Sequence, residues 1–496
     1  MPLCRTCGFD SATDLEEMQP NTILGRIDLR NRLSELDALI TSLTTERERL
    51  RRVADRIVYP VLSLPPEITA EIFLRCIPPQ SNLSESPSEA PLLLAQICRQ
   101  WRQIALDTPH LWQSLLFRDG EASIELLRLW LSRSGSLPLT LDLKCWDPPR
   151  VGTLMELSLL HSHRWRDVKF GLPHTSFSEL DLRQVSLPLL DSISLRAVQW
   201  SSEDDSVVHT VTITHAPSLR HAHLFDLPSL KMVIPWAPLT TLTLLHNLPF
   251  TECISLLQGC PNLINLTVST AGPVAVNADH IILNSLETLT CNFGTASILE
   301  HLTLPRLSRL DVSNVRDPQH AAMLSAFIGR SGCPLQFLAV RDIRDISPVV
   351  LVHFLRAVPD SVSDVEFAWA RGGSGEPIFS ALQLTGIIPQ LKVLQLHVSG
   401  RMDNEEYKHL LKMLSARVEG RPPRVPLESM TLHVITKQRL LGIMPRSSRI
   451  AELRQLATVG MKVKFTITSY DSTPHVVLDL SAQGASFRYF SNQSSD

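Results

Sequence analysis

The chain has 496 residues, of which 44% are hydrophobic, enough for about two or three domains of common size with a substantial core. Its 47 lysines and arginines against 50 aspartates and glutamates give a formal net charge of −3. There is therefore no overall positive field to displace counterions from a phosphate backbone, which excludes nucleic acid as the expected main partner.

The nine cysteines are scattered along the chain, and their odd number is unlike a disulfide framework and typical of a reducing compartment. The N-terminus lacks the basic segment and apolar run of a secretion signal, and no stretch approaches the roughly 18 apolar residues of a membrane helix. We therefore expect a cytoplasmic or nuclear protein with no membrane partner. Residues 1–20 are expected to be disordered, and Cys4 and Cys7 to be free thiols, because no second close cysteine pair completes a zinc site.

A long helix is predicted over residues 21–58. Apolar residues recur at alternating steps of four and three from Leu29 to Ile57, interrupted only by Arg47, over about four heptads. The seam is typical of a coiled coil and would allow self-association through residues 29–57. A single amphipathic helix that docks on its own domain explains the pattern equally well.

Two short helices are predicted within residues 60–117. The first opens at Leu64-Pro65-Pro66-Glu67-Ile68, where proline and an early acidic residue suit a first turn, and it ends before Pro78. The second runs as one helix from about Pro91 to Thr108. Between them, residues 78–91 are rich in proline, serine and glutamate, a composition that predicts a mobile loop.

These residues resemble the F-box family. Its first half is matched by Leu64-Pro65-Pro66-Glu67-Ile68 with Ile72-Phe73, and its second half by Ile97-Cys98-Arg99-Gln100-Trp101-Arg102-Gln103-Ile104-Ala105 and Pro109-His110-Leu111-Trp112. The long insert and the upstream leucine-rich helix are similar to F-box proteins of mushroom-forming fungi.

The resemblance implies a substrate-recognition subunit of a Skp/cullin/F-box E3 ubiquitin ligase, which binds the Skp adaptor and, through it, the cullin complex. Its matched positions imply an adaptor-binding set, namely Leu64, Pro65, Ile68, Ile72, Phe73, Cys98, Trp101, Ile104, Leu111 and Trp112. Two alternatives stay open: the apolar stripes bury against the following domain, or the chain is a ligase-independent scaffold or interaction protein.

Residues 120–490 are predicted to form a degenerate leucine-rich-repeat domain. The pattern apolar-x-x-apolar-x-apolar recurs about 20 to 36 residues apart, starting at Trp165, Leu190, Leu219, Leu239, Leu263, Leu286, Leu307, Leu335, Val362, Leu391 and Leu427. Each copy would supply one strand whose leucines are buried by stacking on its neighbours. The asparagine that bonds the turn in that family is missing from most copies, so a β-helix or irregular β-rich domain stays open. The predicted fold class is mixed α and α/β: an N-terminal coiled-coil helix, a small helical F-box and an irregular leucine-rich-repeat solenoid.

Strand alternation predicts which side chains point away from the buried leucines and line the inner face of such a solenoid. They are His221 and His223, Thr241 and Thr243, Asn265 and Thr267, Thr288 and Thr290, Arg309 and Asp311, Asp364 and Glu366, Gln395 and His397. This mixed, hydroxyl-rich face is the candidate binding surface for a target protein whose identity the sequence does not specify.

The main catalytic signatures are missing. No Gly-x-x-x-x-Gly-Lys-Ser/Thr, His-Glu-x-x-His or Gly-x-Ser-x-Gly occurs in the chain. His161-x-His163 and His221-x-His223 have no carboxylate or cysteine at ligand spacing, so no metal site is assigned. We therefore expect a protein that is not an enzyme, with no catalytic residues and no cofactor.

Overall fold

A computed structural model of the protein describes residues 23–54, 60–77, 86–118, 124–180, 182–198, 209–227, 230–271, 280–292, 295–313, 315, 318–343, 347–369, 373–400, 402–418, 425–436, 447–458, 460–469, 475–479 and 486–490. The predicted disordered segment 1–20, with Cys4 and Cys7, and residues 78–85 of the predicted mobile insert lie outside these ranges. The rest of that insert, residues 86–91, forms a turn ahead of the second helical segment.

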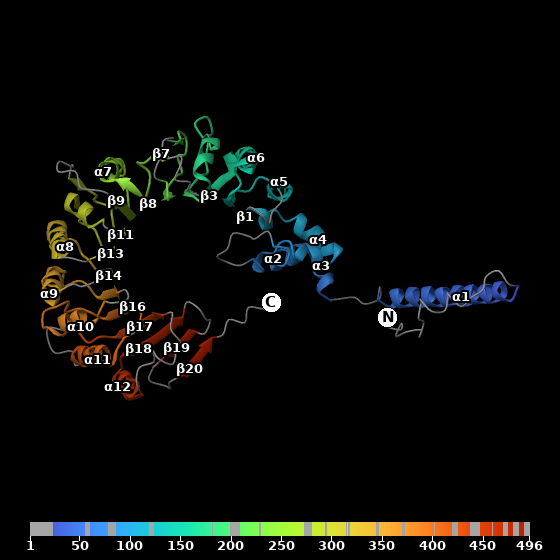
Figure 1. The fold of residues 1–496 in the computed structure, drawn as a ribbon. Coiled ribbons are helices and arrows are strands. Elements are labelled where there is room, and N and C mark those ends of the chain that lie inside the picture. The colour runs from blue at the N-terminus through green and yellow to red at the C-terminus, as the bar shows by residue number, and fades with distance from the viewer. Residues whose placement is uncertain are drawn as a thin grey trace.

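The N-terminal helix α1 (Ile23–Ala54) spans 32 residues, and none of them is buried. Figure 1 shows α1 reaching away from the rest of the molecule. The described part of the predicted helix over 21–58 is thus helical. Docking on its own domain, one of the two readings of its seam, is not the arrangement found. The coiled-coil pairing stays a prediction.

Five short helical segments follow: η1 (Pro60–Ser63), α2 (Pro66–Arg75), α3 (Leu94–Ile97), α4 (Arg99–Leu106) and η2 (Pro109–Trp112). The single helix expected from Pro91 to Thr108 is wrong. It divides at Cys98, whose backbone is extended with φ −155° and ψ 168°. The Cys98 Sγ accepts a hydrogen bond from the Trp101 amide at 3.5 Å, so Cys98 caps α4, and a capping residue needs a non-helical backbone.

A 16-stranded sheet is the main element of the described part of the chain that follows. In spatial order its strands are β1 (Ser114–Arg118), β2 (Leu139–Lys144), β3 (Trp165–Leu172), β4 (Ser192–Ala197), β6 (His221–Phe225), β8 (Thr241–Pro249), β9 (Asn265–Ala271), β11 (Thr288–Asn292), β13 (Arg309–Ser313), β14 (Phe337–Ile343), β15 (Asp364–Trp369), β16 (Val393–Ser399), β17 (Ser429–Thr436), β18 (Lys462–Ser469), β19 (His475–Asp479) and β20 (Ser486–Phe490). Neighbours are parallel as far as β18, whereas β18, β19 and β20 are antiparallel. The sheet begins at Ser114, inside the predicted range 60–117 and ahead of the predicted boundary at 120.

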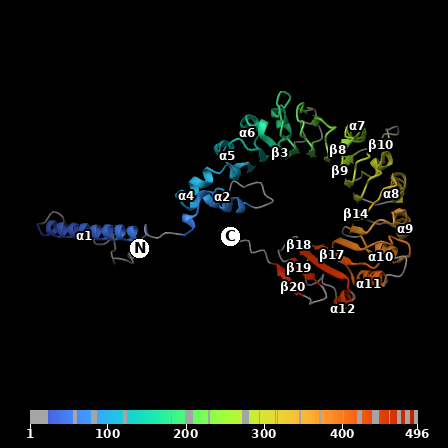
Figure 2. The same cartoon turned by 180° about the vertical axis from the view of Figure 1, so that it is seen from behind.

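The sheet curves into an arc whose inner side is made of strands and whose outer side is made of helices (Figures 1 and 2). The outer helices are α5 (Ile124–Arg133), α6 (Pro148–Leu159), α7 (Phe250–Gln258), α8 (Pro318–Ser331), α9 (Pro348–Ala357), α10 (Glu376–Gln383), α11 (Asn404–Val418) and α12 (Ser447–Thr458). Other connections hold the short helices η3 (Ser162–Arg164), η4 (His174–Glu179) and η5 (Thr295–His301), and the strand pairs β5 (His209–Thr212) with β7 (Leu230–Val233) and β10 (Ile281–Ile282) with β12 (Leu302–Thr303). Connections that contain a full helix are longer, which accounts for the uneven spacing of the sequence pattern.

The core lies between the sheet and this outer layer. Each copy of the sequence pattern begins at or just before a strand of the large sheet. Leu242 and Leu244 on β8 are buried and stand in register with Leu266 and Val268 on β9. Parallel in-register pairing stacks these apolar side chains into continuous rows, so one hydrophobic core runs along the arc.

Arginines of the outer layer bond backbone carbonyls of the preceding unit. The fully buried guanidinium of Arg417 donates at 2.8, 2.6 and 2.9 Å to the carbonyl oxygens of Leu382, Ile387 and Ile388. Arg164 and Arg330 make similar bonds to carbonyls at 2.9 and 3.0 Å. A buried carbonyl oxygen needs a hydrogen-bond donor. These arginine side chains provide the donors for turn carbonyls in copies that lack the asparagine of the repeat family.

No helix within the described ranges combines the length and apolarity that a membrane crossing requires.

Candidate functional site

Helix α2 presents one apolar face to the core and another to solvent. Pro66 stands in its first turn, and the Thr69 hydroxyl donates to the Pro65 carbonyl oxygen at 3.2 Å, which fixes the start of the helix. Phe73 is completely buried. Ile68 and Ile72, one turn apart, are 51% and 43% exposed. Two branched aliphatic side chains on the solvent face of a short helix form a ready contact for a partner.

The buried face of α2 packs on α4 through an aromatic pair. The Phe73 and Trp101 rings meet edge to face, with 5.0 Å between centroids. Ile104 and Ala105 of α4 are buried beside them. This packing holds the exposed isoleucines of α2 in place.

The module ends in η2, which joins it to the sheet. Leu111 and Trp112 are buried, and the Trp112 indole donates to the Ala105 carbonyl oxygen at 2.8 Å. Trp112 also contacts Trp130 of α5 edge to face, with 4.9 Å between ring centroids. The helical module is thus packed directly against the first unit of the arc.

The predicted adaptor-binding residues therefore divide into two groups. Pro65, Ile68 and Ile72 are exposed and Leu64 is partly exposed, as a docking surface requires. The remaining residues hold the helices together: Phe73, Ile104, Leu111 and Trp112 are buried, and Cys98 and Trp101 are partly buried. Adaptor binding by these residues stays a prediction. The buried residues would contribute to it by holding the helices in position.

Sequence reasoning missed a second exposed apolar pair. Leu93 and Ile97, also one turn apart, are 44% and 54% exposed. Ile97 lies within the single helix expected from Pro91 to Thr108, and it is the last residue of α3 before the break at Cys98. The i, i+4 spacing was the available signal, but it does not say which face is covered.

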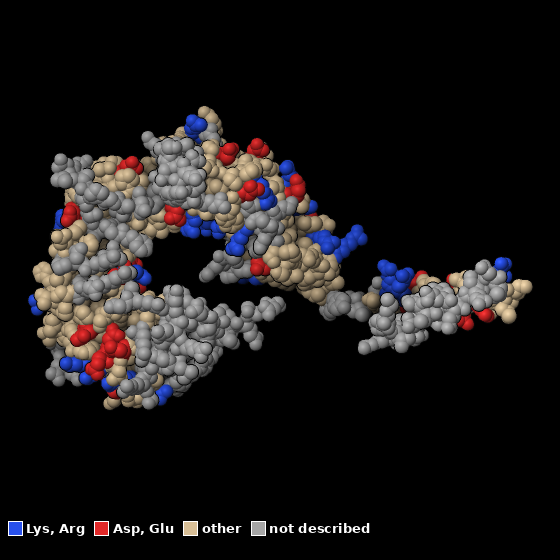
Figure 3. Space-filling view, viewed as in Figure 1, with Lys and Arg blue, Asp and Glu red and all other residues tan. Residues whose placement is uncertain are grey.

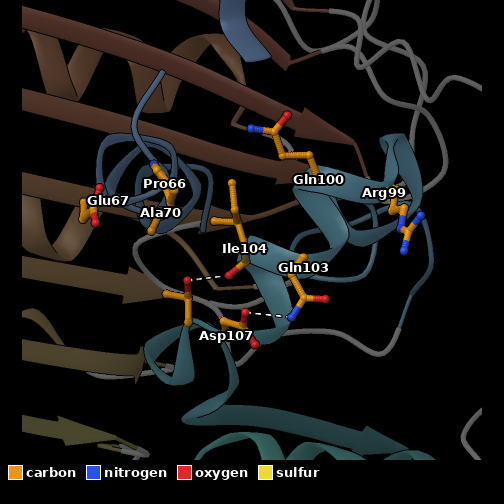
Figure 4. Close-up of a pocket in the computed structure, with 9 residues that line it drawn as sticks. Pro66, Glu67, Ala70, Arg99, Gln100, Gln103, Ile104 and Asp107 are labelled. Atoms are coloured by element: carbon orange, nitrogen blue, oxygen red, sulfur yellow. Dashed lines mark hydrogen bonds between the residues drawn. The ribbon is translucent and has the colours of Figure 1, made fainter. Parts of the chain in front are cut away.

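A pocket of about 770 Å³ lies between α2 and α4 (Figure 4). Pro66, Glu67 and Ala70 line it from α2, and Arg99, Gln100, Gln103, Ile104, Asp107 and Thr108 line it from α4 and its end. The Gln103 amide donates to Asp107 Oδ2 at 2.7 Å on the α4 side of the pocket. Ile68 and Ile72 are not among its lining residues, so the pocket is a separate feature of the module.

The predicted target-binding residues lie together on the inner face of the arc. The parallel register forms one row from His221, Thr241, Asn265, Thr288 and Arg309, and a second row from His223, Thr243, Thr267, Thr290 and Asp311. Asp364 and Glu366 stand in the same two rows on β15, with β14 between, and Glu366 pairs with Gln395. Target binding by this face stays a prediction.

Ion pairs join the later strands of this face. The Arg341 guanidinium on β14 contacts Asp311 at 3.0 Å and Glu366 at 3.0 Å, and His397 Nε2 lies 3.4 Å from Glu366. Burial raises the pKa of Glu366 and lowers the pKa of His397. These directions are opposite to those that a strong ion pair between the two groups would produce, because desolvation is the largest cause for both. Glu366 is only 6% exposed, so a target would reach it through its neighbours.

The first strands of the arc carry a basic row that sequence reasoning missed. Arg118 and Lys144 are in register, and Gly171 separates Lys144 from Arg196. A Cβ at Gly171 would come within 3.1 Å of the Lys144 side chain, so glycine leaves room for that lysine. Figure 3 shows Lys and Arg atoms on the inner side of the arc at this end. Lys144 also lies 3.5 Å from Asp142, so one end of the inner face carries a basic row with an acidic neighbour, and the region around Arg341 is mixed.

The remaining chemistry on these elements is structural. In the part of the chain that the structure describes, no group of three or more histidine, cysteine or acidic side chains is arranged to bind a metal ion. Burial raises the pKa of the Cys253 and Cys260 thiols to about 12, which keeps them protonated in the core.

Comparison with known families identifies the helical module. Residues 61–118 match the family model described as F-box-like. The chain therefore contains an F-box-like domain, and the resemblance read from Leu64 to Trp112 is confirmed. No curated protein matches the chain.

Proposed function

We propose that this chain is the substrate-recognition subunit of a Skp/cullin/F-box E3 ubiquitin ligase. The observation that carries the proposal is the two-sided α2 helix within the F-box-like domain. Its buried side is fixed by Phe73 on Trp101, and its outer side leaves Ile68 and Ile72 about half exposed. An exposed apolar pair on a rigid support suits a permanent protein contact, because little side-chain ordering is needed on binding.

The Skp adaptor would cover Pro65, Ile68 and Ile72, and the exposed Leu93 and Ile97 would extend the contact. The pocket between α2 and α4, with Glu67, Arg99 and Asp107 on its lining, would accept a polar side chain from the same partner. Burying one half-exposed isoleucine contributes about 1 kcal/mol, so the pair contributes about 2 kcal/mol, which is roughly a thirtyfold gain in affinity.

The arc would hold the target protein. Its parallel strands, stacked leucines and outer helices support assignment to the leucine-rich-repeat solenoids in a degenerate form, in which arginines such as Arg417 replace the asparagine ladder. The inner face offers in-register hydroxyls between a basic row and a mixed charged cluster, which suits a folded protein surface better than a phosphate tract. In this role the chain performs no chemistry, because other subunits transfer the ubiquitin.

Affinity capture of the full chain tests the proposal. The wild-type chain should bring down the Skp adaptor together with a cullin, whereas Ile68→Asp/Ile72→Asp should lose both. Leu160→Asp/Val349→Asp is the matched control, because these side chains are 71% and 76% exposed on outer helices and their turns. Capture of the adaptor without a cullin would support a ligase-independent scaffold instead.

A further inference from the structure

Helix α1 carries an apolar seam that nothing in the described structure covers. Leu33 and Leu36 are 53% and 39% exposed, and Ile40, Leu43 and Leu50 are 61%, 59% and 59% exposed. The first four follow one another at steps of three and four, and Leu50 lies seven residues after Leu43, so all five lie along one side of the helix. A seam of this length is unusual on a helix that faces only water.

The middle of α1 is a weak helix by itself. Thr41, Thr44 and Thr45 are β-branched, and their hydroxyls bond backbone carbonyls one turn earlier at 2.7, 2.7 and 2.8 Å. Such residues favour a helix less than straight-chain side chains do. Because most helical stability in proteins comes from packing of an apolar face, this segment needs a partner along the seam.

The heptad pattern and its charges specify that partner. Leu33, Ile40 and Arg47 occupy the a positions, and Leu29, Leu36, Leu43 and Leu50 the d positions. We propose that α1 pairs with α1 of a second copy of this chain in a parallel, in-register, two-stranded coiled coil. The inference does not depend on the proposed function.

The flanking charges favour the parallel arrangement. With the two helices parallel and in register, Arg32 at a g position faces Asp37 of the second copy at an e position, and Glu46 faces Arg51 in the same way. Glu46 also flanks Arg47 of the second copy, the only charge within the leucine seam. An antiparallel pair with Ile40 opposite Leu43 would instead bring Arg30 against Arg51. Within one helix, Arg32 contacts Glu35 at 2.9 Å and Arg49 contacts Glu46 at 3.6 Å. These pairs are exposed and weak, so their side chains can pair with the second copy instead.

Dimerisation through α1 would join two copies of the F-box-like domain and two arcs at one end of each molecule. A target with two recognition elements would then bind both arcs, and the second contact would form at high effective concentration.

Sedimentation velocity of the full chain over a range of concentrations tests the interface. The wild-type chain should be a dimer at micromolar concentration, and Leu36→Asp/Leu43→Asp should be a monomer. The control Asn31→Asp/Thr45→Asp adds the same charges at f positions, away from the seam, and should remain a dimer. Thermal unfolding of the arc should be unchanged in both variants. A monomeric wild-type chain, or a dimeric leucine variant, would overturn the proposal.

A charge exchange tests the orientation. Glu46→Arg should raise the dimer dissociation constant by roughly tenfold, because two attractive pairs become repulsive. Adding Arg51→Glu should recover a large part of this loss, since positions 46 and 51 face each other only in the parallel register, whereas the repulsion between the arginine introduced at position 46 and Arg47 of the second copy remains. A double variant that dimerises no more tightly than Glu46→Arg alone would overturn the parallel arrangement.

Discussion

Trp112 of the F-box-like domain and Trp130 of α5 meet edge to face, with 4.9 Å between their ring centroids. The Trp112 indole donates to the Ala105 carbonyl oxygen at 2.8 Å, and the Trp130 indole donates to the Ser114 carbonyl oxygen at 3.0 Å. One ring is thus fixed to α4 and the other to β1. The pair makes the domain and the arc one packed unit, so a bound adaptor and a bound target would keep a defined spacing.

Trp130→Ala should lower the free energy of unfolding by about 3 to 5 kcal/mol, because a fully buried aromatic side chain leaves a cavity. Chemical denaturation followed by circular dichroism measures the change. Leu129→Ala is the control on the same helix, since Leu129 is 55% exposed, and it should cost well under 1 kcal/mol. Equal effects of the two variants would contradict the role given to Trp130.

Arg417→Met should destabilise the C-terminal part of the arc by about 3 kcal/mol or more, because three buried carbonyl oxygens lose a charged donor while the side-chain volume is largely kept. Denaturant titration with amide hydrogen exchange would locate the loss in α10 and α11. Arg454→Met, an exposed arginine on α12, should have little effect. Unchanged exchange near Ile388 in the Arg417 variant would refute the carbonyl-anchoring role.

Stability should fall as the pH drops below about 6.5, in part through His223. Burial lowers the pKa of His223 below its ordinary value of 6.5, and its Nδ1 lies 2.9 Å from Thr243 Oγ1. As the pH falls, the unfolded chain therefore binds this proton before the folded chain does. The contribution of His223 to the free energy of unfolding is complete above pH 6.5 and is lost as the pH falls through the lower pKa of the folded state. His223→Gln should reduce the difference in urea midpoint between about pH 7.5 and 5.5. An identical pH dependence in both proteins would rule out this contribution.

Target capture should depend on the middle of the inner face. Thr267→Arg/Thr290→Arg places two large charges in one row of adjacent strands and should remove most proteins that proximity labelling detects around the wild-type arc. Thr251→Arg/Ser255→Arg adds the same charges to exposed positions of α7 on the outer side and should leave the labelled set unchanged. If both variants kept the wild-type set, the inner face would not be the binding surface.

The strands were predictable from sequence because alternation reports burial directly. Leu242 and Leu244 are buried while Thr241 and Thr243, which alternate with them, are not. The same alternation marks most of the predicted copies, but Ala339 on β14 and Glu366 on β15 are buried at positions expected to face outward. The face that carries the candidate target-binding rows follows from that alternation alone. The exposed isoleucines of α2 were likewise identified from the F-box motif.

Features set by contacts between distant residues were not predictable. Arg341 reaches Asp311 and Glu366 over sequence separations of 30 and 25 residues, and Arg417 reaches carbonyls 29 to 35 residues away. In the sequence such arginines are indistinguishable from solvated surface charges. The extended backbone of Cys98 was also hidden, because the apolar stripe continues through it with helical spacing.

The affinity of the purified Skp adaptor for the full chain, measured by isothermal titration calorimetry, tests the central claim most directly. The wild-type chain should bind the adaptor, and Ile68→Asp/Ile72→Asp should weaken binding at least about tenfold with unchanged thermal unfolding. Leu160→Asp/Val349→Asp should bind as the wild-type chain does. Absence of adaptor binding by the wild-type chain, or equal affinity of the α2 variant, would contradict the account.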